Sequence, residues 1–220
     1  MNWAQNLVTA MRNNYNYSEH GQDEYCYPKS IVLINSFGLK DYDSLAAVER
    51  DITFVKSVEL EKNPIRGRYD FAHLRAIHRY LFCDIYEWAG EIRRGEFLIK
   101  GDTIFCRGQF ITQYAENIFE KLKNENKLRN LKREEFIQRL AYYMGEINAL
   151  HPFREGNGRS ARAFFMALSR SAGYELNFNV VSPELLLDAD IEAFDKNFDP
   201  LISILESIIC KKKRHGAMDD

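Results

Sequence analysis

The sequence predicts a mainly α-helical protein with a single short β-hairpin. Along most of the chain, apolar residues recur at intervals of three and four, which is the period of helices that bury one face. Residues 91–106 differ, because two short runs rich in Ile, Phe and Leu flank a turn-forming centre, Lys100-Gly101-Asp102. With 220 residues, 45% of them hydrophobic, the chain is long and apolar enough for one packed domain.

The helical patterns have recognisable boundaries. Asp70 is placed to cap a helix at its N-terminus, Gly90 lies where that helix should stop, and Asn63-Pro64 breaks the pattern before it. We expect helices over residues 42–60, 70–88, 109–122, 132–150, 156–172, 183–196 and 198–210. In chain order we expect a poorly packed lead-in, one domain and a frayed basic tail, at residues 1–28, 29–210 and 211–220.

The composition restricts the setting and the class of partner. A net charge of -2, from 30 basic and 32 acidic residues, lacks the positive excess of proteins that coat nucleic acid. No apolar run approaches the ~20 residues that cross a bilayer, and the N-terminus has no signal-peptide pattern. The four cysteines form no C-x-x-C pair, which indicates reduced thiols. We therefore expect a cytoplasmic protein with no direct nucleic-acid or membrane partner, with secretion into a host left open.

Twelve residues between two expected helices, HPFREGNGRSAR at 151–162, carry the candidate chemistry. Pro152 disfavours the α conformation at His151, so the preceding helix should end at Leu150 and present the imidazole at its mouth. Glycines on both sides of Asn157 would let backbone N–H groups turn inward at the start of the next helix. Unsatisfied N–H donors and the helix dipole both favour phosphate at such a place.

The charged residues of this segment complete a site for a polyphosphate. Arg159 and Arg162, three positions apart, would project from one face of the helix as forked donors. Glu155 would repel phosphate unless a divalent cation such as Mg²⁺ lay between them. His151 is the nearby group whose ordinary pKa suits proton removal near neutrality. Taken singly, each feature is commonly structural. Their joint occurrence favours phosphoryl or nucleotidyl transfer.

This segment resembles the signature of the Fic (filamentation induced by cAMP) family, H-x-F-x-D/E-G-N-G-R-x-x-R. Residues 87–93, EWAGEIR, resemble the family's stretch leading into its flap. Residues 25–41, YCYPKSIVLINSFGLKD, resemble the lead-in of the bacterial toxin-like subgroup and its type IV-secreted relatives. The resemblance covers about residues 25–205. It implies a Fic-type helical bundle in which the hairpin at 91–106 is a short β-hairpin flap over the active site.

The resemblance also implies an activity and a role for each residue. The protein would be an adenylyltransferase that moves AMP from Mg-ATP to a Ser, Thr or Tyr hydroxyl of a target protein and releases pyrophosphate. His151 would be the base, Phe153 would anchor the loop in the core, and Glu155 would hold Mg²⁺. The phosphates would be bound by Gly156, Asn157, Gly158, Arg159 and Arg162. A target segment would pair with the flap at Lys100, Gly101, Asp102, Thr103, Ile104 and Phe105.

Regulation is expected to come from a partner. Many members of this family carry an inhibitory helix with S/T-x-x-x-E-G/N. The best N-terminal register, from Ser30, has Ile34 at the glutamate position, and residues 112–117 fit the letters but lie in mid-domain. The resemblance thus implies a small separate antitoxin-like protein and, by subgroup analogy, targets such as type II topoisomerase subunits.

Two alternatives stay open. The same site would serve the transfer of phosphate or of another nucleotide moiety, although Gly156 and Gly158 match the AMP-transferring version of the loop. A non-catalytic nucleotide-binding regulatory module would need the arginines and glycines but no base, which is why His151 and Glu155 argue against it.

Overall fold

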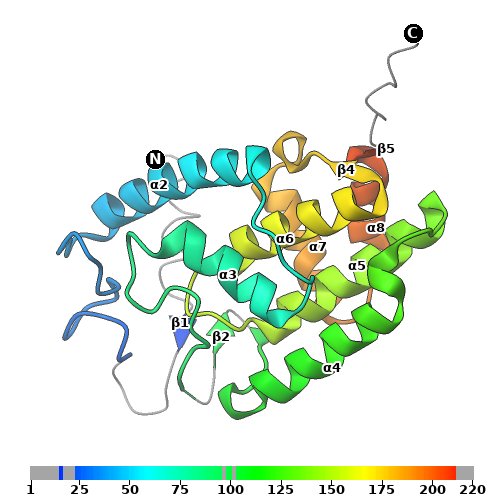
Figure 1. The fold of residues 1–220 in the computed structure, drawn as a ribbon. Coiled ribbons are helices and arrows are strands. Elements are labelled where there is room, and N and C mark those ends of the chain that lie inside the picture. The colour runs from blue at the N-terminus through cyan, green and yellow to red at the C-terminus, as the bar shows by residue number, and fades with distance from the viewer. Residues whose placement is uncertain (1–14, 17–22, 96–97, 101–102, 212–220) are drawn as a thin grey trace, which may run out of the picture.

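The computed structural model describes residues 15–16, 23–95, 98–100 and 103–211, and this part of the chain confirms the mainly α fold (Figure 1). Its helices are α2 (Tyr42–Lys62), α3 (Phe71–Phe82), α4 (Ile111–Asn124), α5 (Arg133–Leu150), α6 (Asn157–Ala172), α7 (Pro183–Phe194) and α8 (Asp199–Ile208). Short 3₁₀ turns lie at Gly108–Phe110, Asn126–Leu128 and Phe178–Val180.

Local sequence signals account for several helix ends. Asp41 caps α2 by accepting a hydrogen bond from the backbone N–H of Ser44 at 2.8 Å. Asp70 caps α3 in the same way, from the N–H of His73 at 2.9 Å, as predicted. Gly173 ends α6 in the left-handed region at φ 94°, which glycine adopts without strain.

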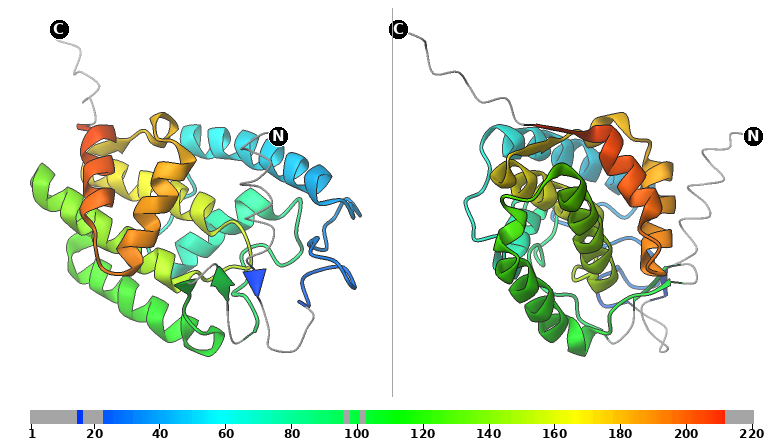
Figure 2. Two further views of the ribbon diagram at one scale, coloured as in Figure 1. Left: turned by 180° about the vertical axis from the view of Figure 1, so that it is seen from behind. Right: turned by 90° about the vertical axis from the view of Figure 1, so that its right-hand side faces the viewer.

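Helix α5 is the centre of the bundle. Ten of its 18 residues are buried, and it contacts α4, α6, α7 and α8. Figure 2 shows α4 on one side of α5 and the pair α7 and α8 on another. Helix α3 packs on α6, and α2 lies across both. Residues 151–156 join the C-terminus of α5 to the N-terminus of α6. These two helix ends carry the candidate site.

Two small antiparallel sheets accompany the helices. The predicted hairpin is present as β2 (Ile99–Lys100) and β3 (Thr103–Ile104), and a third strand, β1 (Tyr15–Asn16), pairs with β2 on its other side. Gly101 and Asp102, at the turn, lie outside the described residues.

The second sheet was not predicted. Strand β4 (Tyr174–Leu176) pairs with β5 (Ile209–Lys211), so the helix expected to reach residue 210 ends at Ile208 instead. Backbone groups near Ile208 find partners across the chain, as in the bond from the N–H of Asn177 to the carbonyl of Ile208 at 3.3 Å. This pairing joins segments far apart in sequence, which a local pattern does not reveal.

The helix expected over 70–88 ends early, at Phe82, and that expectation was wrong. Its apolar period continues, since Ile85 and Tyr86 are almost completely buried, but the backbone there forms turns. The carbonyl of Ile85 accepts a hydrogen bond from the N–H of Ser36 at 2.8 Å. A tertiary hydrogen bond therefore stabilises the turn that follows α3. The apolar spacing over residues 83–88 indicated burial of these side chains, not a helical backbone.

Part of the expected lead-in is attached to the domain. The ring of Tyr25 contacts Trp88 edge-on at 5.6 Å between centroids, and Cys26 is buried. Asp23 pairs with Arg154 of the 151–162 segment, with 2.6 Å between Oδ2 and Nη2. Most of residues 1–22, and the tail after Lys211, lie outside the described residues. In the described part of the chain no helix combines the length and apolar character needed to span a membrane.

Candidate active site

The backbone turns sharply where α5 ends. As predicted, Leu150 is the last residue of the helix, and His151 leaves the α region. Its conformation is left-handed, with φ 42° and ψ 61°, rather than the extended one that a following proline usually selects. The N–H of His151 still donates to the carbonyl of Ile147 at 3.2 Å, so the turn is closed by the helix itself. This turn places the imidazole of His151 at the C-terminal end of α5.

His151 is held by three contacts, two of which are made by its imidazole ring. Its Nδ1 lies 3.2 Å from the carbonyl oxygen of Asn148, which can only accept, so Nδ1 carries the proton. Its ring stacks on Phe105 with centroids 3.8 Å apart. The backbone carbonyl of His151 accepts a hydrogen bond from Nε of Arg93 at 2.9 Å. In the neutral ring the basic lone pair therefore lies on Nε2, as a general base requires.

The loop is closed by the side chain of Asn157. Its Oδ1 accepts from the N–H of Phe153 at 2.9 Å, and its Nδ2 donates to the carbonyl of Phe153 at 2.8 Å. The Phe153 ring is completely buried and stacks on His78 at 3.8 Å, so the predicted anchor is confirmed. Asn157 was expected to bind phosphate. Because its side chain is hydrogen-bonded to the backbone of Phe153, its backbone N–H is the group that remains as a candidate phosphate donor.

His78 supports the loop from α3. Its Nε2 donates to the carbonyl of Glu155 at 2.8 Å, and its Nδ1 accepts from the N–H of Gly90 at 2.8 Å. Burial lowers the pKa of His78 to about 4, so the ring is neutral and both contacts persist at physiological pH. Glu155 lies 77 residues from His78 in the sequence, so no local pattern indicates this contact.

Gly156 is required by its surroundings. It has φ 81°, and a Cβ built on it would lie 2.3 Å from the ring of Phe82. Its N–H donates to Oε1 of Glu155 at 2.9 Å. Helix α6 begins at the next residue, so the N–H groups of Asn157 and Gly158 belong to its first turn, where no carbonyl of the same helix can accept them. These two amides are the candidate phosphate donors.

Arg159 and Arg162 have different partners, although both line one cavity of about 340 Å³ between α2 and α6. Nη2 of Arg159 lies 2.5 Å from Oε1 of Glu49 and 3.4 Å from Oε1 of Glu155. Arg162 lies beside Gly158. Burial lowers its pKa, while the carboxylate of Asp190 opposes this shift. The expectation that both guanidinium groups project from one face of the helix stays a prediction. The ion pair with Glu49 was not foreseen.

Glu155 is the candidate magnesium ligand. Within the described ranges no group of three or more His, Cys, Asp or Glu residues is arranged to hold a metal ion. A single carboxylate beside phosphate donors nevertheless fits Mg²⁺, which is commonly held by one or two carboxylates, with phosphate oxygens and water completing its shell. The donor set therefore fits an ion that arrives with a polyphosphate.

The flap residues divide into two groups. Ile104 is 55% exposed, which suits contact with another molecule. Phe105 is buried and its ring stacks on that of His151, whereas the sequence predicted it among the target-docking residues. Lys100 pairs through its backbone with Tyr15 and Thr103.

Comparison with known proteins shows similarity along most of the chain. Residues 68–169 match the model of the Fic/DOC family. The chain is 40% identical over 187 residues to protein adenylyltransferase VbhT of Bartonella schoenbuchensis, covering 85% of this chain but 39% of that relative. It is 38% identical over 192 residues to the probable protein adenylyltransferase y4lH of Sinorhizobium fredii, covering 86% and 96%.

Solved structures give the same result. BepC of Bartonella tribocorum with bound AMPPNP superimposes with a TM-score of 0.84 at 28% identity, covering 89% of this chain and 100% of that one. The N-terminal Fic domain of a Bep effector from Bartonella quintana with bound ADP gives 0.82 at 31% identity, covering 88% and 98%. Because residues 68–169 match the family model and the chain covers 96% of the y4lH relative at 38% identity, the chain belongs to the Fic/DOC family.

Proposed function

We propose that the protein is an adenylyltransferase that transfers AMP from Mg-ATP to a Ser, Thr or Tyr hydroxyl of a target protein. The observation that carries this proposal is His151, which lies at the end of α5 with its Nδ1–H committed to Asn148, one short loop before the N-terminus of α6. A base is thereby placed near an anion-binding helix end. The names of the relatives and the nucleotides in the solved neighbours support the same activity.

Each residue of the loop then has a task. Nε2 of His151 would accept the proton of the incoming hydroxyl as its oxygen bonds to the α-phosphorus. The bond from that phosphorus to the oxygen bridging the α and β phosphates would break, releasing pyrophosphate. The N–H groups of Asn157 and Gly158 would bind phosphate oxygens, with positive charge from Arg159 and Arg162. Positioning and charge neutralisation would supply most of the rate.

Glu155 is proposed as the protein ligand of the magnesium ion. When bound, the ion would neutralise charge on the phosphates. The chain's contribution is to orient the carboxylate. It does so through the N–H of Gly156 on Oε1 and through His78 on the Glu155 carbonyl. The first contact holds the carboxylate of Glu155 and the second holds its backbone carbonyl, so the carboxylate would face the bound nucleotide in one orientation.

The flap is proposed to bind a target segment by strand pairing. One edge of β2 is already paired with β1, so within the described residues the outer edge of the sheet on the other side is that of β3, Thr103–Ile104. Main-chain pairing tolerates many sequences, which suits a modifying enzyme. Phe105 follows directly and stacks on His151, so a segment held along β3 would lie close to the base.

An inhibitory antitoxin-like protein is proposed to act at the cavity between α2 and α6. Besides Arg162, this cavity is lined by other charged residues, among them Arg50 and Arg170, and by apolar side chains such as Phe54, which is 68% exposed. A helix that presents a glutamate among apolar residues would match this lining. Its carboxylate would pair with Arg162 and exclude phosphates from that guanidinium.

The proposed compartment is the cytoplasm, which supplies ATP and keeps thiols reduced. The four cysteines are unpaired, and two of them, Cys83 and Cys210, are exposed. Proteins with an accessible hydroxyl are the proposed targets, and type II topoisomerase subunits are the first to assay.

The test compares ATP labelled at the α-phosphate with ATP labelled at the γ-phosphate, each incubated with purified protein and a cell lysate. Label transferred to protein from the α position alone is expected, and His151→Ala should abolish it while still binding ATP by calorimetry. Transfer from the γ position alone would instead identify a phosphotransferase. Intact ATP binding without any transfer, on lysate or on topoisomerase subunits, would favour a nucleotide-binding module.

A further inference from the structure

Glu49 of α2 reaches the active-site loop from outside the 151–162 segment. Its Oε1 lies 2.5 Å from Nη2 of Arg159, and its Oε2 accepts a hydrogen bond from the hydroxyl of Tyr86. The Glu49 side chain is 12% exposed and that of Arg159 is 27% exposed. Burial and the nearby Glu49 carboxylate raise the pKa of Tyr86, so its hydroxyl remains a donor at all physiological pH values. Glu49 is thus held from two directions.

Arg159 lies between two carboxylates at unequal distances. The Glu49 contact is 2.5 Å, whereas the contact with Oε1 of Glu155 is 3.4 Å. Nη1 of Arg159 also donates to Oγ1 of Thr53 at 3.2 Å, and its guanidinium lies 4.8 Å from the centre of the Phe82 ring. These contacts fix the plane of the guanidinium toward α2. Although burial opposes it, the two carboxylates raise the pKa of Arg159, so the cation is permanent.

This arrangement matters for Glu155. A guanidinium that is released from other partners forms two parallel bonds with a nearby carboxylate and occupies both of its oxygens. A carboxylate bound in this way would be a poor ligand for Mg²⁺, because ligand and guanidinium would compete for the same lone pairs. The partner that restrains Arg159 therefore controls how available Glu155 is to a cation.

We propose that Glu49 is a positioning residue that holds Arg159 on α2 and so keeps the Glu155 carboxylate available to Mg²⁺. The inference rests on the proposed function, in which Glu155 binds the ion that accompanies ATP. It adds a residue 110 positions from its partner, on a helix that the sequence motif does not include. Tyr86 and Thr53 complete the support, the first on Glu49 and the second on Arg159.

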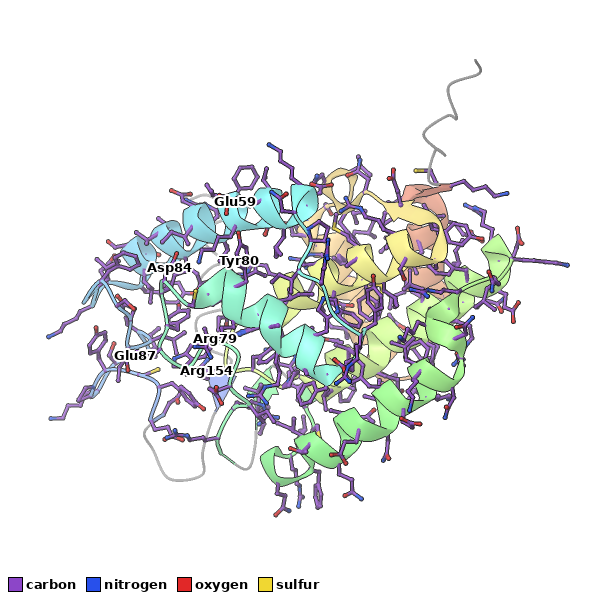
Figure 3. The ribbon with its side chains drawn as sticks, viewed as in Figure 1. Glu59, Arg79, Tyr80, Asp84, Glu87 and Arg154 are labelled. Carbon is purple, nitrogen blue, oxygen red and sulfur yellow. The ribbon has the colours of Figure 1, made fainter. Side chains whose placement is uncertain are left out.

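The chain contains a matched control on the same helix, α2. Glu59, ten residues after Glu49 on α2, accepts a hydrogen bond from the hydroxyl of Tyr80 at 2.7 Å (Figure 3). This pair has the same chemistry as Glu49 with Tyr86, but among the described contacts of Glu59 there is no arginine of the loop. Glu59→Gln therefore removes a glutamate–tyrosine contact of α2 without releasing Arg159.

The experiment measures the Mg²⁺ dependence of nucleotide binding and of AMP transfer. In Glu49→Gln, the half-saturating Mg²⁺ concentration for transfer should rise about five- to tenfold, the size of a partly buried charge interaction, and saturating Mg²⁺ should restore most of kcat. Calorimetry with Mg-ATP on the inert His151→Ala background should show the same loss of affinity. Glu59→Gln should leave both values unchanged. In an Arg159→Gln background, adding Glu49→Gln should produce no further shift.

The outcomes separate the possible failures. A lower kcat in Glu49→Gln at every Mg²⁺ concentration, with an unchanged half-saturation value, would show that Glu49 is merely structural. An unchanged Mg-ATP affinity in a variant whose Tm matches that of the wild type would overturn the inference. If Glu49→Gln does not fold, Thr53→Val, which removes the other hydrogen bond between Arg159 and α2, should shift the Mg²⁺ requirement in the same direction, and no shift would count against the inference. If the wild type binds no Mg-ATP, the proposed function itself fails.

Discussion

The side chain of Asn157 forms hydrogen bonds with both backbone polar groups of Phe153, at 2.9 Å to its N–H and at 2.8 Å to its carbonyl. One amide thereby closes the loop between the end of α5 and the start of α6. An amide is required because it supplies an acceptor and a donor from one planar group. Neither aspartate nor alanine does so.

Asn157→Ala should destabilise the protein and weaken catalysis. Losing both bonds, and leaving two partly buried backbone groups unpaired, should lower the free energy of unfolding by about 2 kcal/mol. Urea denaturation measures this change, and AMP transfer should fall with it. Asn197→Ala, at an exposed asparagine whose amide binds Glu192, should change stability by no more than about 0.5 kcal/mol. Equal effects of the two substitutions on stability would contradict the proposed role of the Asn157 side chain in closing the loop.

Stability should depend on pH through His78. Its pKa is about 4 in the folded protein and about 6.5 when unfolded, so the unfolded chain binds more protons between these values. Stability is therefore fully present above pH 6.5 and should fall as the pH decreases toward 4, by about 3 kcal/mol in total. Urea titrations at a series of pH values measure the slope. His78→Gln should reduce it, while His73, whose pKa burial also lowers, accounts for part of the remainder.

Gly156 should tolerate no side chain. Gly156→Ala combines a positive φ of 81° with a Cβ 2.3 Å from the Phe82 ring, and should cost about 3 kcal/mol or more. Gly38→Ala is the matched control, because φ is 67° there but nothing lies within 4 Å of the new Cβ. Strain alone should cost about 1 kcal/mol at that position. Thermal unfolding of both variants distinguishes strain from collision, and a Gly38 effect as large as that at Gly156 would rule out the collision.

The ion pair between Asp23 and Arg154 should be important for stability. It is almost buried, with side chains 14% and 6% exposed, and Figure 3 shows Arg154 below the end of α3. Asp23→Asn removes a carboxylate that pairs with a buried guanidinium and should cost about 3 kcal/mol. Glu61→Gln, which breaks the more exposed pair with Arg170, should cost about 0.5 kcal/mol. Chemical denaturation provides the comparison, and similar values for the two would contradict it.

Several parts of the fold and site were predictable because they depend on neighbours in sequence. The Asp70 cap, the end of α5 at Leu150 and the burial of Phe153 follow from short-range rules of capping, proline geometry and apolar spacing. The same rules were wrong over 83–88, where burial continued but the helix did not, because the hydrogen bond from Ser36 is tertiary.

The sequence by itself determined the candidate reactive groups, since a histidine, a carboxylate, two glycines and three arginines within twelve residues must be carried on one loop and one helix start. Only the tertiary structure decided how those groups are held. Glu155 is supported by His78 from 77 residues away, Arg159 by Glu49 from 110, and Arg154 by Asp23 from 131. Such contacts depend on how helices pack against one another. Packing is set by the whole core, so no local pattern specifies which side chains meet.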